Sequence, residues 1–173
     1  MNHDIPMRFG WALEIMALRA KDKILEIGCG TGLAAQLICA QLAGGKFEAI
    51  DRSASMIGKA KEKNAQYVAG GVAKFTCADL ADFESREIFD KIFSFNVNLF
   101  WTKKSISREA NNLVDHLDGR GYLYLFYGPA VPGGLRKIAR TLVTNLEING
   151  FKVQDQIFDR AADCCCFIAR KRM

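Results

Sequence analysis

The feature that most constrains the fold is a glycine-rich loop that directly follows a short apolar run. Residues 24–27 are mostly apolar, glycines follow at Gly28, Gly30 and Gly32, and a stretch of helical periodicity begins at Leu33. Glycine allows a sharp turn and lets a ligand approach the free N–H groups of a helix N-terminus. A strand, a tight loop and a helix in this order predict a nucleotide-type site in an α/β sheet.

The rest of the chain alternates between short runs of branched or aromatic residues and longer helical stretches, which predicts a mostly parallel sheet covered by helices. An amphipathic helix is expected over Met7–Ala20, and one or two helical turns between Asp79 and Asp90. Only residues 159–163 separate the last two runs, so these form an antiparallel pair at a sheet edge. The predicted strands are Lys23–Ile27, Lys46–Ile50, Ala73–Cys77, Lys91–Phe95, Tyr122–Tyr127, Phe151–Phe158 and Cys165–Arg170.

Length and composition limit the function classes. The 173 residues suit a single domain over 1–173, with residues 1–20 as an N-terminal helical arm. No apolar run reaches the roughly 20 residues of a membrane span, and no secretory signal is recognisable, so a cytoplasmic protein is expected. The six cysteines have neither disulfide nor CxxC spacing, and the run at 164–166 alternates faces within a strand, so no metal site is predicted.

The spacing within the glycine loop identifies the ligand class. A nicotinamide fingerprint requires a glycine at position 33, where Leu33 stands. The block instead resembles the first signature of class I S-adenosylmethionine-dependent methyltransferases, with Glu26 at the acidic position. The resemblance implies that this loop holds the amino-acid part of S-adenosyl-L-methionine. The residues implied are Glu26, Gly28, Cys29, Gly30, Thr31 and Gly32.

The same resemblance extends to the next two strand ends. The segment 50–57 is similar to the family's second signature, which implies that Asp51 binds the ribose diol, beside Arg52, and that Met56 lies on the adenine face. Asp79, followed by Leu80, occupies the position whose acid accepts a hydrogen bond from the adenine amino group. For Asp51 a helix cap is the alternative interpretation.

The family resemblance also implies the complete topology. The expected fold is α/β, a Rossmann-like three-layer domain with a mostly parallel seven-stranded sheet in the order 3-2-1-4-5-7-6, strand 7 being antiparallel. In such sheets a ligand binds at the carboxyl ends of the strands. The Pro- and Gly-rich loop 128–134 follows the fifth strand, so it is expected to border the site.

Candidates for the chemical step follow the fourth and fifth strands. Asn96 and Asn98 carry amides that could contact the cofactor or the acceptor, and Asn96 is also expected at the cofactor. Trp101 and Tyr127 are candidate acceptor contacts, with a place in the core as the alternative. The two histidines, His3 and His116, are not convincing general bases.

Methyl transfer is an in-line displacement that depends mainly on positioning, so a dedicated base is optional. A small-molecule methyl acceptor is the first hypothesis. An RNA methyltransferase is less favoured, because the net charge of +5 includes only one basic cluster, at residues 170–172. A partner subunit that binds the cofactor without turnover is the third hypothesis. The sequence does not indicate whether the protein is a monomer or an oligomer.

Overall fold

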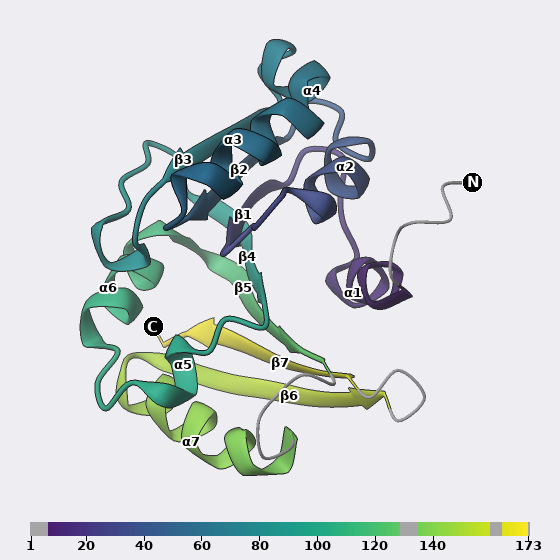
Figure 1. The fold of residues 1–173 in the computed structure, drawn as a ribbon. Helices are drawn as coiled ribbons and strands as arrows, with labels where there is room; N and C mark the ends of the chain where they lie inside the picture. The colour runs from purple at the N-terminus through teal and green to yellow at the C-terminus, as the bar shows by residue number, and fades with distance from the viewer. Residues whose placement is uncertain (1–6, 129–134, 160–163, 173) are drawn as a thin grey trace.

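The chain forms a single seven-stranded sheet with helices on both of its faces (Figure 1). The computed structural model describes residues 7–128, 135–159 and 164–172. The elements are α1 (Met7–Met16), β1 (Lys23–Ile27), α2 (Leu33–Cys39), β2 (Lys46–Asp51), α3 (Ala54–Lys63), α4 (Ala65–Ala69), β3 (Ala73–Cys77), the 3₁₀ turn η1 (Leu80–Asp82), β4 (Phe89–Phe95), α5 (Leu99–Thr102), α6 (Ser107–His116), β5 (Leu117–Tyr127), α7 (Leu135–Ile148), β6 (Phe151–Asp159) and β7 (Cys164–Lys171).

The predicted strand order is confirmed. The strands lie in the order β3-β2-β1-β4-β5-β7-β6, the first five are parallel, and β7 is antiparallel to both β5 and β6. The central strands are apolar runs because helices cover both of their faces, as parallel sheets require. Parallel pairing brings the carboxyl ends of β1 to β5 to one edge of the sheet.

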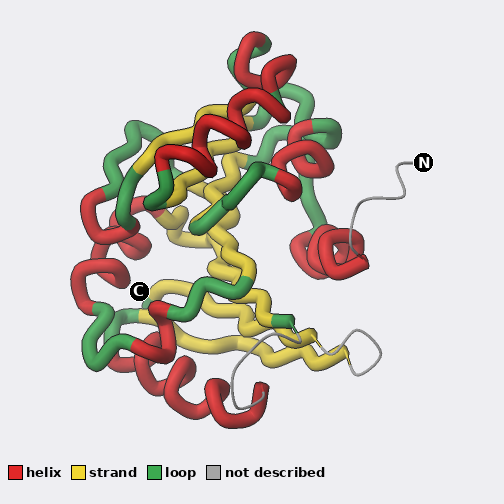
Figure 2. Tube along the Cα trace, in the orientation of Figure 1, coloured by secondary structure: helices red, strands yellow, loops and turns green. Residues whose placement is uncertain are grey.

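Helices lie on both faces of the sheet (Figure 2), and a hydrophobic layer fills the space between the sheet and the helices on each face. One layer contains side chains of α5, α6 and α7, including Phe100, Leu113 and Leu142. The other contains side chains of α1, α2 and α3, including Met16 and Ile38. The cysteine run divides between the two layers, with Cys165 in the first layer and Cys166 in the second, as the alternation of a strand requires.

Three element boundaries differ from the prediction by two residues or more. The first helix ends at Met16 rather than Ala20, because Ala17 adopts a left-handed φ of 44° and is exposed. β4 begins two residues early, at Phe89, and β5 begins five residues early, at Leu117. The pairing of Phe89 with Leu117, with an irregularity before Lys91, extends both strands through a glycine-containing segment that local sequence rules assign to a loop.

The remaining local predictions concern loops. The short stretch after β3 contains the single turn η1, as expected. Of the loop 128–134, only Gly128 belongs to the described residues, and the rest of that prediction lies outside them. No helix in the described part of the chain is long and apolar enough to cross a membrane.

Candidate functional site

A cavity of about 400 Å³ opens at the carboxyl edge of the sheet, where the segments after β1, β2, β3 and β4 meet. Seven residues predicted for the site line it. They are Gly28, Asp51, Arg52, Asp79, Leu80, Asn96 and Asn98. Seven others complete the lining: Ile27, Ile50, Ala78, Val97, Leu99, Thr102 and Lys103.

Backbone hydrogen bonds fix the glycine loop against the end of β2. The N–H groups of Gly28 and Cys29 both donate to the carbonyl of Ile50, at 2.8 and 3.0 Å. Gly28 has a φ of 71°, and a Cβ there would lie 2.7 Å from Cγ2 of Val97. Gly30, at a φ of 53°, has open space where its Cβ would stand. The loop therefore packs closely against the segment after β4 at Gly28, whereas there is free space beside Gly30.

Asp51 connects the loop to the following helix. Its Oδ2 accepts a hydrogen bond from the N–H of Gly30 at 2.9 Å, and its Oδ1 accepts one from Ser53 at 2.9 Å. The residue that caps α3 is Ser53, whose Oγ accepts from the N–H of Met56 at 3.3 Å. The alternative of Asp51 as the helix cap is therefore wrong. An ionised carboxylate has about four lone-pair sites, so Asp51 keeps acceptor capacity at the cavity.

Glu26 lies behind the loop with its side chain in the interior. It is 3% exposed, and Oε2 has no hydrogen-bond partner among the described residues. Burial, and secondarily the charge of Asp51, raises the pKa of Glu26 to about 8. A buried carboxylate without a cation is unstable in its charged form. A cationic ligand group near the loop would relieve this.

Asp79, the third of the predicted acids, and the adjacent Leu80 both line the cavity. Asp79 accepts a hydrogen bond from the N–H of Ala81 at 3.0 Å and caps η1, so it serves as a turn residue while it also lines the cavity. Leu80 is buried beside it. Met56 is 36% exposed. The described lining of the cavity contains neither Met56 nor the other predicted cofactor residues Glu26, Cys29, Gly30, Thr31 and Gly32.

The two asparagines lie where β4 ends. Asn96 has a φ of 53°, a conformation that asparagine tolerates better than other L residues. Its Oδ1 accepts a hydrogen bond from the N–H of Gly128 at 2.9 Å, which ties the ends of β4 and β5 together. This leaves its amide nitrogen available at the cavity. Asn98 is exposed at the start of α5.

The aromatic candidates are placed mainly in the core. Tyr127 is 1% exposed, its hydroxyl donates to the carbonyl of Val97 at 2.9 Å, and burial raises its pKa. Trp101 packs partly buried against the α5 to α7 layer, and its indole N–H has no partner among the described residues. His116 accepts from the N–H of Ser85 and is not part of the cavity. Tyr127 thus supports the site by positioning Val97.

Sequence reasoning missed Thr102 and Lys103. Thr102 ends the short helix α5, which folds back over the cavity, and Lys103 follows it. Lys103 forms an ion pair with the buried carboxylate of Glu109. No motif marks these positions, because only the path of α5 brings them to the strand ends. Among the described residues, no group of three potential metal ligands is found.

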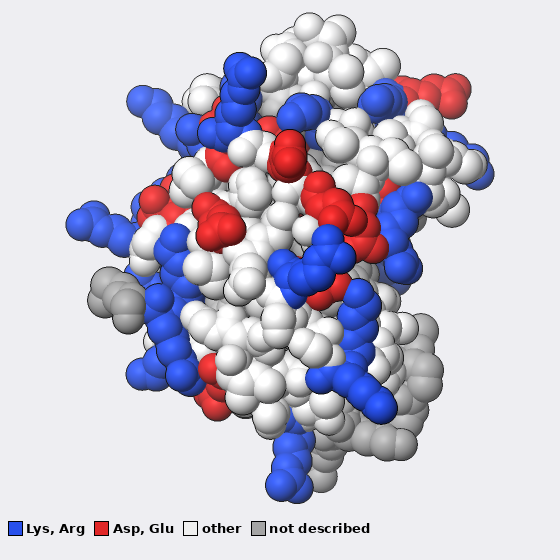
Figure 3. Space-filling model, turned by 90° about the vertical axis from the view of Figure 1, so that its left-hand side faces the viewer, with Lys and Arg blue, Asp and Glu red and all other residues white. Residues whose placement is uncertain are grey.

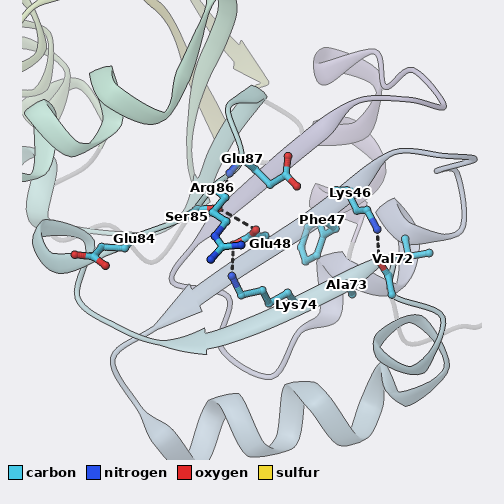
Figure 4. Close-up of a pocket in the computed structure, with 11 residues that line it drawn as sticks. Lys46, Phe47, Glu48, Val72, Ala73, Lys74, Glu84, Ser85, Arg86 and Glu87 are labelled. Atoms are coloured by element: carbon cyan, nitrogen blue, oxygen red, sulfur yellow. Dashed lines mark hydrogen bonds and ion pairs between the residues drawn. The ribbon is translucent and has the colours of Figure 1, made fainter.

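A larger cavity of about 560 Å³ lies elsewhere, at the amino ends of β2 and β3 (Figure 4). None of the predicted site residues lines it. Of these two cavities, the smaller one is lined by Gly28 of the glycine loop and by the acids Asp51 and Asp79, so it is the candidate functional site.

Comparisons with known proteins agree with this geometry. A family model described as a methyltransferase domain matches residues 24–121. A malonyl-[acyl-carrier protein] O-methyltransferase from Ilyobacter polytropus is 30% identical over 138 residues, which cover 78% of this chain and 50% of that protein. The chain therefore spans about half the length of this relative.

Solved structures share the fold at low sequence identity. The N-methyltransferase NodS from Bradyrhizobium japonicum has a TM-score of 0.74 at 19% identity, covering 96% of each chain. The [4+2]-cyclase SpnF has a TM-score of 0.79 at 13% identity, covering 96% of this chain and 81% of that one. Structural similarity at such low sequence identity establishes the fold, whereas the reaction has to be inferred from the residues of the site.

Proposed function

Since the chain belongs to the family of methyltransferase domains, we propose that it transfers a methyl group from S-adenosyl-L-methionine to the carboxylate of a small-molecule acceptor. Membership of this family implies S-adenosyl-L-methionine as the cofactor. The observation that carries the proposal is the cavity at the glycine loop, which combines acids for the cofactor with amide donors and cations for an anionic acceptor.

The residues present fit the cofactor. Open space in front of Gly30 admits the backbone of an amino acid. The buried Oε2 of Glu26, which has no hydrogen-bond partner in the described part of the chain, suits a nearby ammonium group. Asp51 would accept from the ribose diol and Asp79 from the adenine amino group. When bound, the cofactor supplies an electrophilic methyl group on a sulfonium. The protein then has to hold the acceptor in line with that group and exclude water.

The acceptor class follows from the groups around the cavity. The lining carboxylates, Asp51 and Asp79, already accept backbone hydrogen bonds, and His116 is not among the described residues that line the cavity. A carboxylate acceptor is ionised at neutral pH and needs no general base. Asn96 and Asn98 can donate hydrogen bonds to it, and Arg52 and Lys103 supply positive charge. The named activity of the Ilyobacter relative, methylation of a malonyl group, supports the same class.

RNA is a weaker candidate for the acceptor. Figure 3 shows Lys and Arg in separate groups, interspersed with Asp, Glu and uncharged residues, on the face that it presents. A nucleic-acid backbone is usually met by a continuous basic surface. A cytoplasmic location and a single domain remain predictions.

Purified protein with radiolabelled cofactor tests the proposal. The acceptors are short dicarboxylic acids, free and as thioesters, together with matched amines, alcohols and RNA. We expect alkali-labile methyl esters, recognised by the release of volatile labelled methanol. Label found only in amines or RNA would contradict the carboxylate assignment. Cofactor binding with no label in any acceptor would favour the non-catalytic partner.

A further inference from the structure

Helix α6 contacts a segment that contributes to the cavity proposed to hold the cofactor (the cofactor cavity), although the described lining of that cavity includes no residue of α6. Arg108, Asn112 and His116 follow one another at intervals of four residues, so their side chains lie on one face of the helix. All three contact residues 82–85, in the segment that leads from Asp79 toward β4. This face of α6 therefore holds the segment from outside the cavity.

Asn112 makes the central contact. Its Nδ2 donates to the carbonyl of Phe83 at 2.6 Å, and Phe83 is buried. One helical turn earlier, Arg108 pairs with Asp82 at 2.7 Å on the surface, where ion pairs contribute little. The Oδ1 of Asn112 is buried and has no partner among the described residues, which costs stability. An apolar side chain of similar size would therefore serve packing better, and the amide is explained by its hydrogen bond to Phe83.

His116 makes the last contact in this row, and its two neighbours define its tautomer. Its Nδ1 lies 2.9 Å from the carbonyl oxygen of Asn112, and its Nε2 lies 3.3 Å from the backbone nitrogen of Ser85. A carbonyl only accepts and a backbone N–H only donates, so Nδ1 carries the proton and Nε2 accepts. The imidazole also packs against the ring of Phe83, with 5.3 Å between the centroids. His116 thus fixes the backbone two residues beyond Phe83.

The segment held by α6 begins at an acid of the cofactor cavity. Residues 79–83 form one hydrogen-bonded turn, in which the N–H of Asp82 donates to the carbonyl of Asp79 at 3.1 Å and the N–H of Phe83 donates to that of Leu80 at 3.5 Å. The side chain of Asp79 accepts from the N–H of Ala81 at 3.0 Å. Because the backbone and the side chain of Asp79 belong to the same turn, a displacement of Phe83 would redirect the Asp79 carboxylate relative to the cavity.

We propose that Asn112 and His116 are positioning residues that set the preference for adenine in the cofactor, by holding the segment 79–85 so that Asp79 faces the adenine amino group. The inference rests on the proposed function, in which Asp79 accepts a hydrogen bond from that group. Neither positioning residue lines the cavity, so their effect passes through Asp79. Loss of the hydrogen bond between Asn112 and Phe83 should therefore lower the preference for adenine more than the general affinity for the ligand.

Calorimetric titration with two ligands measures this preference. The ligands are S-adenosylhomocysteine and its analogue in which hydrogen replaces the adenine amino group. The wild type should prefer the first by at least about tenfold, the value of a hydrogen bond to a charged acceptor. Asn112→Leu should lower that preference to about threefold or less, because a misdirected carboxylate loses most of this bond. The matched control, Asn111→Leu, makes the same replacement at an exposed position of α6 and should keep the wild-type preference.

A double-mutant cycle shows whether Asn112 acts through Asp79. Asp79→Ala should abolish the preference, and adding Asn112→Leu should then have no further effect on it. A wild-type preference that Asn112→Leu leaves intact, equal losses of affinity for both ligands, or an effect that persists with Asp79→Ala would overturn the inference and leave the cofactor assignment standing. If Asn112→Leu melts early, His116→Phe carries the test, because it keeps an aromatic ring against Phe83 and removes the acceptor for Ser85.

Failure of the proposed function has a different signature in the same titrations. A wild type that binds both ligands equally, or a preference that survives Asp79→Ala, would overturn the assignment of Asp79 to the adenine amino group. The role of Asn112 and His116 would then be overturned with it.

Discussion

Asp51 illustrates how one side chain can serve both the fold and a ligand. Its carboxylate orders the loop through Gly30 and the start of α3 through Ser53, and it still faces the cavity. A substitution at this position should therefore act on both stability and affinity, and the two effects can be measured separately.

We predict that Asp51→Ala raises the dissociation constant for S-adenosylhomocysteine by roughly ten- to a hundredfold, because hydrogen bonds to a charged acceptor are lost. The free energy of unfolding should also fall by about 1–3 kcal/mol, since two backbone donors lose their acceptor. Calorimetric titration and urea unfolding measure the two quantities. An unchanged affinity together with lowered stability would assign Asp51 a purely structural role.

Glu26 should make stability depend on pH. Its folded pKa of about 8 lies above the ordinary value of 4.5, so between these two values the folded state retains a proton that the unfolded state releases. Stability of the ligand-free protein should therefore be greatest at low pH within this window and fall as pH rises toward 8, by about 4–5 kcal/mol at most.

The matched variant Glu26→Gln keeps the shape of the side chain and removes the titration. We expect its unfolding free energy, measured in urea at several pH values from 5 to 8, to depend less steeply on pH than that of the wild type. Parallel pH profiles for the two proteins would show that Glu26 ionises normally.

At the scale of elements, two of the three glycines in the loop between β1 and α2 have opposite surroundings. A Cβ on Gly32, whose φ is 73°, would lie 2.7 Å from the Nδ2 of Asn64 and 3.0 Å from the Cβ of Ala60. That Nδ2 is buried and donates to the carbonyls of Gly32 and Ala60. Gly32 thus sets how closely the loop packs on α3, whereas Gly30 faces open space.

We predict different consequences for alanine at these two glycines. Gly32→Ala should lower the free energy of unfolding by about 2–4 kcal/mol, through left-handed strain and the clash with α3. Gly30→Ala should cost only about 1–2 kcal/mol, from strain alone, but should weaken cofactor binding because its methyl group occupies the ligand's space. Urea unfolding and calorimetry of both variants test this pair. Equal losses of stability would refute the packing argument.

At the scale of the whole molecule, the cofactor cavity draws on the segments after four strands, so a ligand bound there links most of the sheet. We predict that S-adenosylhomocysteine at a hundred times its dissociation constant stabilises the protein by about 2.7 kcal/mol. That corresponds to a rise in melting temperature of roughly 5–10 °C for a chain of this size.

The same experiment compares ligand classes. A nicotinamide dinucleotide at equal concentration should produce a much smaller rise, because Leu33 replaces the third glycine of its fingerprint. Scanning calorimetry measures both shifts. A larger shift with the dinucleotide would overturn the cofactor assignment.

The sequence by itself determined the sheet and the loop. The strands and the antiparallel pairing of the last two follow from hydrophobic periodicity and connection lengths, which are local in the chain. The strand order follows from the family resemblance. Gly28, Asp51, Asp79 and Asn96 could be predicted at the cavity for a related reason. Each ends a strand or lies within two residues of its end, and parallel pairing brings strand ends to one edge.

Only the tertiary structure decided the remaining features. Lys103 reaches the cavity because α5 folds back over the strand ends, and Tyr127 is withdrawn into the core by its hydrogen bond to Val97. Ala17 ends α1 early, although the residues up to Ala20 continue the helical pattern. The larger cavity, at the amino ends of β2 and β3, likewise combines residues of these two strands with residues 84–87. These outcomes depend on contacts between residues distant in sequence, which periodicity and spacing do not encode.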